Sequence, residues 1–264
     1  MQNIPEQEPG HAPPMIRVPL PHDRPILTYV LLAVIVGVFF VQVILMQVNF
    51  PEPEPITPWG ALDYRRILEN GEYYRIFTSM FLHANQVHLL FNGLALYVFG
   101  RTVESFFGTG RFGLIYLIGG LCGSVASFIF TRGYSVGASG ALFAVFGAEM
   151  IFLYQNRRIL GPAAQEQLRS LAILAALNFS LGLFTQVAAT AVRIDNWAHL
   201  GGFFAGIVLT WYIGPQYRLL NDRSAPAGIR VVDIVSLRRT WIVPVLFAAG
   251  LVLAMIYAIA SWRL

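Results

Sequence analysis

The chain lacks lysine altogether and has one cysteine and few charges of either sign. Its 18 basic residues are all arginine, and charged residues make up only 12% of its 264 positions, about half the share found in soluble domains. A single cysteine, Cys122, excludes an intramolecular disulfide and lacks the spacing of a metal site. The arginines are scattered through short loops, so we expect no nucleic-acid partner. No metal or cofactor is expected either.

The sequence contains long runs of apolar residues. Hydrophobic residues account for 56% of the chain, and a helix needs about 20 apolar residues to cross a bilayer. We therefore predict an all-α polytopic membrane protein embedded in a lipid bilayer. Seven apolar stretches are visible, at residues 26–48, 87–106, 111–131, 139–154, 169–187, 196–214 and 240–261.

These stretches divide the chain into four parts. Residues 1–24 are rich in Pro, Gln and Glu, which predicts a disordered cytoplasmic tail. Residues 25–214 form a six-span core with a long outer loop at 49–86, whose aromatic residues favour short helices in the membrane interface. Residues 215–239 are predicted to be a basic cytoplasmic tether, and residues 240–264 hold the seventh span.

The arginines also predict the orientation of the chain, because cytoplasmic loops are enriched in basic residues. With the N-terminus inside and the C-terminus outside, twelve arginines are cytoplasmic and six are external. The second, fourth and sixth spans then run from the outside to the inside. The six external arginines are Arg65, Arg66, Arg75, Arg132, Arg193 and Arg263.

The fourth apolar stretch is short. From Ser139 to Tyr154 it offers 16 residues, or about 24 Å of helix, before it meets Arg157 and Arg158. A helix that begins at Ser139 must start below the outer surface, and residues 131–137 would enter the membrane as irregular backbone. His199 precedes Arg218 by nearly the same spacing, so Ser139 and His199 are predicted to lie at one depth.

A serine and a histidine at one depth suggest a nucleophile and its base. Neither Asp195 nor Glu149 is spaced to orient the imidazole, which favours a dyad over a triad. His88 and Asn92 share one helix face, and with the Ser139 amide they could stabilise an oxyanion. Two glycines would let the backbone turn sharply around the serine: Gly137 and Gly140.

Other interpretations of these residues remain open at this point. Small residues and single polar residues in membrane helices also serve helix packing, as in Gly202-x-x-x-Gly206. A membrane protein that binds and sorts client helices without catalysis would share the composition. A transporter with His88 and His199 on a proton path would need internal inverted repeats, which the sequence does not show.

The full set of motifs resembles the rhomboid intramembrane serine proteases. The resemblance covers residues 56–214 and rests on Arg75-x-Phe77-Thr78-x-Met80-Phe81-x-His83, His88-Leu89-Leu90-Phe91-Asn92, Gly100-x-x-Val103-Glu104, Gly137-Ala138-Ser139-Gly140 and Ala198-His199-x-x-Gly202-x-x-x-Gly206. It implies a six-helix rhomboid bundle with one extra C-terminal helix (6+1). It also implies a wet cavity that opens to the outer side.

The resemblance further implies a role for each site residue. Ser139 would be the nucleophile and His199 the base, with His88, Asn92 and the Ser139 amide as oxyanion donors. Phe143 stands where some members have a tyrosine, and being i+4 from Ser139 it could supply a ring surface to the histidine. The positions of Arg75 and Glu104 look structural. Substrates would be single-span membrane proteins entering beside the fifth span, and the membrane would be a bacterial plasma membrane.

Overall fold

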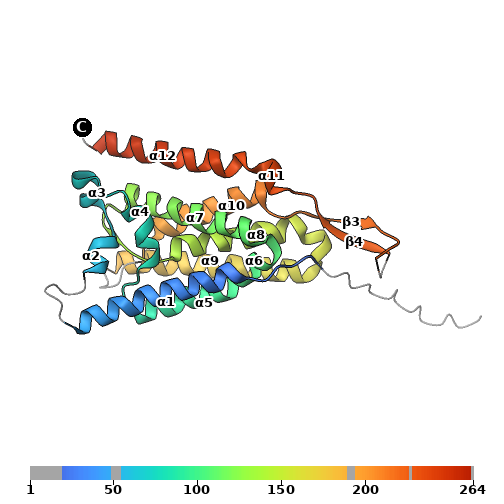
Figure 1. Cartoon of the computed structure of the whole chain (residues 1–264), viewed down its shortest axis with the longest axis horizontal. Coiled ribbons are helices and arrows are strands. Elements are labelled where there is room, and N and C mark those ends of the chain that lie inside the picture. The colour runs from blue at the N-terminus through green and yellow to red at the C-terminus, as the bar shows by residue number, and fades with distance from the viewer. Residues whose placement is uncertain (1–19, 49–54, 189–193, 226–227, 263–264) are drawn as a thin grey trace, which may run out of the picture.

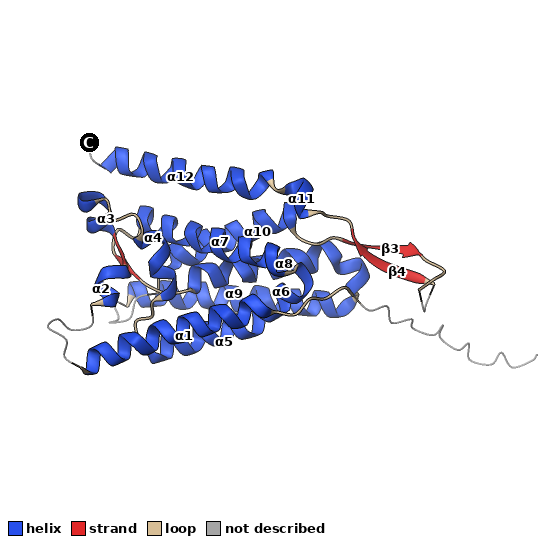
Figure 2. Cartoon of the chain, viewed as in Figure 1, coloured by secondary structure: helices blue, strands red, loops and turns tan. Residues whose placement is uncertain are grey.

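The computed structural model describes residues 20–48, 55–188, 194–225 and 228–262. Its long helices run roughly parallel to the longest axis of the molecule (Figure 1). The long segments are α1 (Ile26–Gln47), a continuous second helix formed by α5 (Gln86–Ala95), η2 (Leu96–Gly100) and α6 (Arg101–Phe107), α7 (Thr109–Phe130), α8 (Ser139–Leu160), α9 (Pro162–Val187), α10 (Asn196–Ile213) and α12 (Ile242–Trp262). The few strands lie only at the two ends of this helical bundle (Figure 2).

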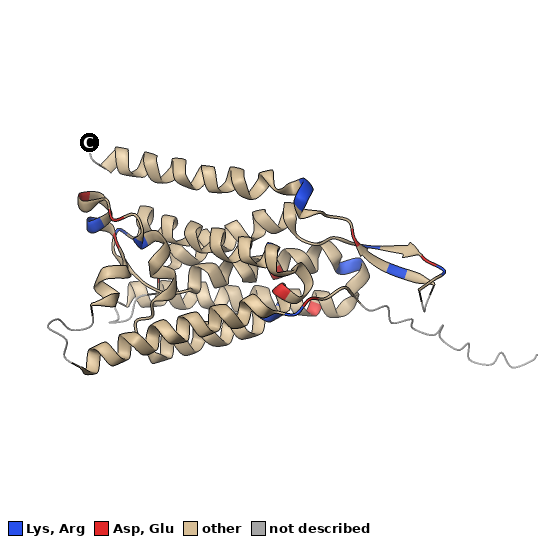
Figure 3. Cartoon of the chain, in the orientation of Figure 1, with Lys and Arg blue, Asp and Glu red and all other residues tan. Residues whose placement is uncertain are grey.

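The bundle has the character of a membrane domain. Four helical segments are long and apolar enough to cross a bilayer, and charged residues gather toward the two ends of the bundle (Figure 3). The remaining long helices, α5–α6, α8 and α10, pack among them. The predicted all-α polytopic helical bundle is therefore confirmed, and the protein is an integral membrane protein. The four apolar segments are Ile26–Gln47, Thr109–Phe130, Pro162–Val187 and Leu237–Trp262.

Helices α7, α8 and α10 form the centre of the bundle. Within its most apolar stretch, 61% of α7 is buried inside the protein, against 17% of α9 and 11% of the last helix. Glycines allow the central helices to approach closely, since a methyl group on Gly202 or Gly206 of α10 would collide with the carbonyls of Gly140 or Ala144 in α8. Such small-residue contacts replace the hydrophobic driving force that is missing between helices in lipid.

The outer loop folds over one end of the bundle. It contains α2 (Ile56–Gly60), β1 (Leu62–Asp63), α3 (Tyr64–Asn70), α4 (Arg75–Thr78) and η1 (Ser79–Phe81), so the predicted short helices are confirmed. Arg75 is fully buried and holds the loop together. Its Nη1 donates to the carbonyls of Pro58 and Ala61 at 2.8 and 2.9 Å, and its Nε donates to Glu72 at 2.6 Å. Hydrogen bonds from Asn70 and Arg75 lower the pKa of the Glu72 carboxyl.

Glu104 ties α6 to the beginning of α1. Its two buried carboxylate oxygens accept hydrogen bonds from the amides of Leu27 and Thr28, from the Thr28 hydroxyl and from the Thr109 hydroxyl, at 2.7–2.9 Å. The first amides of a helix have no partner within the helix, so a carboxylate there satisfies them and favours the helix dipole. The structural role expected for Arg75 and Glu104 is confirmed.

The segment after α10 is more than a tether, which corrects the sequence prediction for residues 215–239. It folds into an antiparallel hairpin of β3 (Tyr217–Asn221) and β4 (Ile229–Asp233), which projects from the bundle (Figure 1) and leads through α11 (Leu237–Thr240) into α12. The buried Asn156 of α8 fixes its base, accepting from the Tyr217 amide at 2.8 Å and donating to the Pro215 carbonyl at 3.0 Å. Arg111 of α7 pairs with Asp233 at 2.6 Å.

Several predicted boundaries were also wrong. Helix α8 extends past the arginines to Leu160 and spans 22 residues, or about 33 Å. In its last turns Gln155 donates to the Trp211 carbonyl of α10, and Asn156 donates to the Pro215 carbonyl. Helix α9 begins at Pro162, directly after Gly161, rather than at residue 169. The predicted irregular segment before Ser139 contains a two-residue strand, β2 (Tyr134–Ser135), which pairs with β1. Of the predicted tail, residues 1–19 lie outside the described residues.

Candidate functional site

Ser139 is the first residue of α8 and follows a sharp turn in the backbone. Gly137 has a φ of 133°, a conformation that side-chain-bearing residues rarely adopt. Its amide donates to the Ser79 carbonyl at 2.9 Å, which ties the turn to the outer loop. The β1–β2 pairing holds the preceding residues. The chain thus delivers Ser139, half-buried, at the N-terminal end of a long helix, where unpaired amides favour negative charge.

His199 lies in the first turn of α10 and is buried. The Asp195 carboxylate caps this helix by accepting from the Ala198 amide at 3.1 Å. The Phe143 ring of α8 stacks on the imidazole, with ring centroids 4.2 Å apart and planes 17° apart. The ring contact expected from the i+4 spacing of Phe143 is therefore present.

The structure places Ser139 and His199 at adjoining points of two helices in contact. Gly140, directly after the serine, faces Ala198, directly before the histidine, so closely that a Cβ on Gly140 would lie 3.4 Å from the Ala198 carbonyl oxygen. Ser139 and Ala198 both line a cavity of about 20 Å³, which is room for roughly one water molecule. Ser139 and His199 thus lie at the same level along the bundle.

His88 and Asn92 come to the same place from α5. A Cβ on Gly137 would lie 2.8 Å from His88 Nε2 and 3.5 Å from Asn92 Nδ2, so both side chains lie against the turn before Ser139. The Asn85 side chain caps α5 and accepts from the His88 amide at 2.9 Å. Asn92 is buried, and its Nδ2 has no hydrogen-bond partner among the described residues. All six predicted site residues therefore gather in one region.

Two acidic residues near these helices are engaged elsewhere. The Asp195 carboxylate also accepts from the hydroxyls of Ser127 and Thr131. Glu149 lies ten residues along α8 and accepts from Gln167 of α9 at 2.6 Å. Nδ1 of His199 has no partner among the described residues, so neither carboxylate orients the ring.

Sequence reasoning missed the contacts of Gln42 and His83. Gln42 is buried in α1; its Nε2 donates to the His83 carbonyl at 3.3 Å and to the Thr57 hydroxyl at 2.5 Å. Only 1% of His83 is exposed, and its ring meets the ring of His88 edge-on with centroids 5.2 Å apart. The position of Gln42 inside the apolar run at 26–48 was the available signal, since a polar residue in lipid needs a partner.

The arrangement can support acyl-transfer chemistry. A hydroxyl at the N-terminus of α8 and a buried imidazole in the first turn of α10 belong to two helices in contact, and a histidine and an amide that can donate to an oxyanion lie against the turn before the serine. In the described part of the chain, no three His, Cys, Asp or Glu side chains converge as metal ligands. The expectation that no metal is required stays a prediction.

The fold and this constellation define a helical membrane protein with a polar site enclosed at one end of its bundle. Residues 70–216, more than half of the chain, match the rhomboid domain, and the chain belongs to the rhomboid family. It is 39% identical to RHOMBOID-like protein 1 of Arabidopsis thaliana over 181 residues, which cover 67% of this chain and 44% of that protein.

A bacterial relative is similar over more of the chain. Rhomboid protease GluP of Bacillus subtilis (strain 168) is 34% identical over 197 residues, covering 73% of this chain and 36% of that protein. RHOMBOID-like protein 2 of Arabidopsis thaliana is 39% identical over 170 residues, covering 63% of this chain and 51% of that protein. The matched part is thus about half or less of each of these relatives.

Proposed function

We propose that the protein is an intramembrane serine endopeptidase that uses a Ser139–His199 dyad. The observation that carries this proposal is the pairing of α8 and α10, which sets the residue after Ser139 against the residue before His199 and stacks Phe143 on the imidazole. The name of the Bacillus relative, a rhomboid protease, supports the same activity.

In this mechanism His199 takes the proton of Ser139 as the hydroxyl oxygen attacks the substrate carbonyl. Phe143 fixes the plane of the imidazole. The negative oxygen of the tetrahedral intermediate accepts hydrogen bonds from His88, Asn92 and the Ser139 amide, and Gly137 leaves room for their approach. Protonated His199 then donates to the leaving amine, and water releases the acyl group by the reverse sequence.

Labelling with a fluorophosphonate tests the nucleophile directly. Purified wild-type protein should label at Ser139, and the label should disappear in Ser139→Ala and fall strongly in His199→Ala. Ser170→Ala, in which a helix-bound hydroxyl of α9 is lost, serves as the matched control and should label normally. Equal labelling of Ser139→Ala and wild type would refute the assignment. A protein that only binds client helices should not label at all.

Cleavage tests the reaction and its substrates, which we propose are single-span membrane proteins. The protein is incubated in detergent with a panel of tagged membrane helices, and the fragments are identified by mass spectrometry. Ser139→Ala and His199→Ala should abolish cleavage. His88→Ala and Asn92→Ala should each lower turnover by about 100-fold, the usual cost of one oxyanion donor. An unchanged rate in both would refute their oxyanion role.

We further propose that the N-terminus is cytoplasmic, that the C-terminus is external, and that the membrane is a bacterial plasma membrane. The excess of arginine at the hairpin end of the bundle supports the orientation. Green fluorescent protein fused after α12 should then stay dark, because it does not fold when exported through the general secretory route. Bright fluorescence of that fusion, at full expression, would reverse the assigned orientation.

A further inference from the structure

An open groove lies on the second long helix, on the face that points away from the rest of the bundle and away from the Ser139 region. It has a volume of about 420 Å³ and is formed along η2 and α6. Its residues follow the rows i, i+4, i+8 twice, so they share one helix face. They are Tyr97, Val98, Arg101, Thr102, Ser105 and Phe106.

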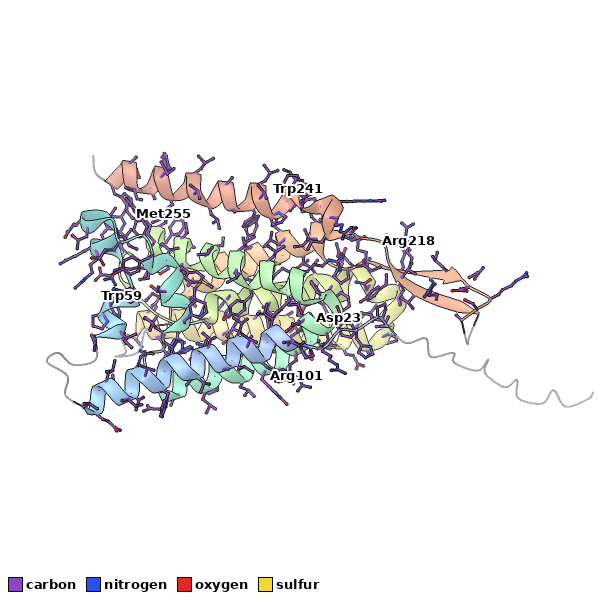
Figure 4. The ribbon with its side chains drawn as sticks, viewed as in Figure 1. Asp23, Trp59, Arg101, Arg218, Trp241 and Met255 are labelled. Atoms are coloured by element: carbon purple, nitrogen blue, oxygen red, sulfur yellow. The ribbon has the colours of Figure 1, made fainter. Side chains whose placement is uncertain are left out.

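Arg101 is the only cation that lines this groove, and it has no acidic partner within the described residues. The ion pairs of the described residues involve other arginines, such as Arg75 and Arg111. The Arg101 guanidinium lies over the Tyr97 ring, 4.5 Å from its centroid. Its Nε is buried without a hydrogen-bond partner, and an unpaired buried donor is costly. Figure 4 shows Arg101 at the outer flank of the bundle, toward the end where Asp23 lies.

The groove also offers polar groups that suit a phosphate. Ser105 presents a hydroxyl beside Arg101, and the Thr102 hydroxyl already donates to the Val98 carbonyl at 3.0 Å. Guanidinium groups bind phosphate oxygens through paired hydrogen bonds. Two acidic residues lie close to the groove. The Glu104 carboxylate accepts four hydrogen bonds inside the bundle. The Asp23 amide donates to the Ser105 carbonyl at 2.7 Å, and the Asp23 carboxylate lies at Gly108.

An apolar stripe continues from the groove along the same helix face. Its exposed side chains recur every three or four residues, over 14 residues from Val87 to Arg101, or roughly 21 Å. That length is close to the reach of an extended acyl chain. A free phosphate ion would make no use of this stripe. The exposed members are Val87, Leu90, Phe91, Leu94, Tyr97 and Val98.

We propose that this face binds an anionic glycerophospholipid, with the phosphate at Arg101 and Ser105 and an acyl chain along the stripe. Basic pockets at the ends of membrane helices bind such headgroups. The proposal is independent of the protease activity, because no residue of the groove belongs to the Ser139 site. It is therefore tested in the Ser139→Ala background, where neither cleavage nor its failure affects the result.

Native mass spectrometry in detergent measures the binding. Ser139→Ala protein is titrated with dioleoyl phosphatidylglycerol, with dioleoyl phosphatidylcholine and with inorganic phosphate as a competitor. Phosphatidylglycerol should bind most tightly, and inorganic phosphate should not displace it. Adding Arg101→Gln should weaken phosphatidylglycerol binding about tenfold, the value of one charged hydrogen bond. Arg101→Lys should weaken it less, because the charge remains.

Arg157→Gln is the matched control. Arg157 also lies over an aromatic ring, that of Tyr154 at 4.2 Å, but its Nη1 donates to the Tyr154 carbonyl at 2.6 Å. This variant should bind phosphatidylglycerol as the parent does. Equal binding by the Arg101→Gln protein with an unchanged melting temperature overturns the proposal. Equal binding of phosphatidylcholine, or displacement by inorganic phosphate, overturns it as well. If the Arg101→Gln protein unfolds, the Arg101→Lys protein is used instead. The proposal is then overturned if Arg101→Lys binds phosphatidylglycerol as tightly as the parent does.

Discussion

Gly123 of α7 lies where three central helices meet, and replacing it with alanine tests how the site is held. A Cβ at this position would lie 2.7 Å from the Ala198 carbonyl oxygen and 3.1 Å from Gly140 Cα. These two atoms belong to the residues next to His199 and Ser139. Ordinary contact distances begin near 3.4 Å, so the methyl group must push the α10 backbone away by roughly 0.7 Å.

The expected effect on activity is larger than the effect on stability. Overpacking of this kind typically costs about 1–3 kcal/mol, which should lower the melting temperature in detergent by on the order of 5 °C. A misplacement of about 1 Å near reacting groups can cost about 100-fold in rate. We therefore expect Gly123→Ala to slow fluorophosphonate labelling and cleavage by about tenfold or more while the protein remains folded.

Gly37→Ala in α1 is the matched control, because a Cβ there meets nothing within 4 Å. It should leave labelling and cleavage unchanged, and its melting temperature should be equal or slightly higher, since alanine favours helix over glycine. The reasoning is refuted if Gly123→Ala keeps the melting temperature and the labelling rate of wild type. That result would mean that α7, α8 and α10 can separate freely at this point.

Three further changes should behave as follows. Glu104→Ala removes four buried hydrogen bonds and should destabilise the protein by roughly 3 kcal/mol, measured by thermal unfolding; a shift no larger than that of an exposed glutamate such as Glu166→Ala would contradict this. Phe179→Ala removes the ring that packs on Phe143 at 5.2 Å and should lower turnover several-fold, whereas the exposed Phe204→Ala should not. The pKa of the Glu72 carboxyl is lowered in the folded protein, so the ionised carboxylate stabilises the fold fully above the unfolded pKa of about 4.3, and this stabilisation is lost as the pH falls through the folded pKa. The melting temperatures of wild type and Glu72→Gln should therefore differ at pH 7 and converge in acid. A difference that stays constant with pH would exclude the ionised carboxylate as its cause.

Hydrophobic runs made most of the fold predictable, because membrane helices require long apolar segments whatever their tertiary contacts. The predicted helix boundaries were wrong where a helix includes polar residues beyond its apolar run. The stretch from Ala163 to Arg169 lacks an apolar run, so the start of α9 was set too late, although Pro162 favours the first turn of a helix. The hairpin at 217–233 was missed because its strands are short and their stability depends on Asn156 and Arg111, which are distant in the sequence.

The sequence predicted contacts of the site along one helix, but not the contacts between distant segments. Equal spacing to the arginines suggested that Ser139 and His199 share one level, although α8 is longer than that argument assumed. Spacing along a helix also suggested the contact between Phe143 and His199. No spacing could show that Gln42 reaches the His83 backbone, or that β1 pairs with β2 next to the serine, since both contacts join segments 41 or more residues apart.

Under the proposed function, the unequal burial of the helices bears on how the site would receive a membrane substrate. The site residues come from α5, α8 and α10, and the glycine contacts of α8 and α10 leave little room for movement. Helix α9 is far less buried than α7, and its C-terminal half is in contact with Asn196, which donates to the Phe179 carbonyl at 3.1 Å, while the Phe179 ring packs on Phe143 and Phe203. Because Phe179 also packs on Phe143, a displacement of α9 would reach the imidazole of His199 through two rings. Movement of α9 would thus change the position of His199, the proposed base.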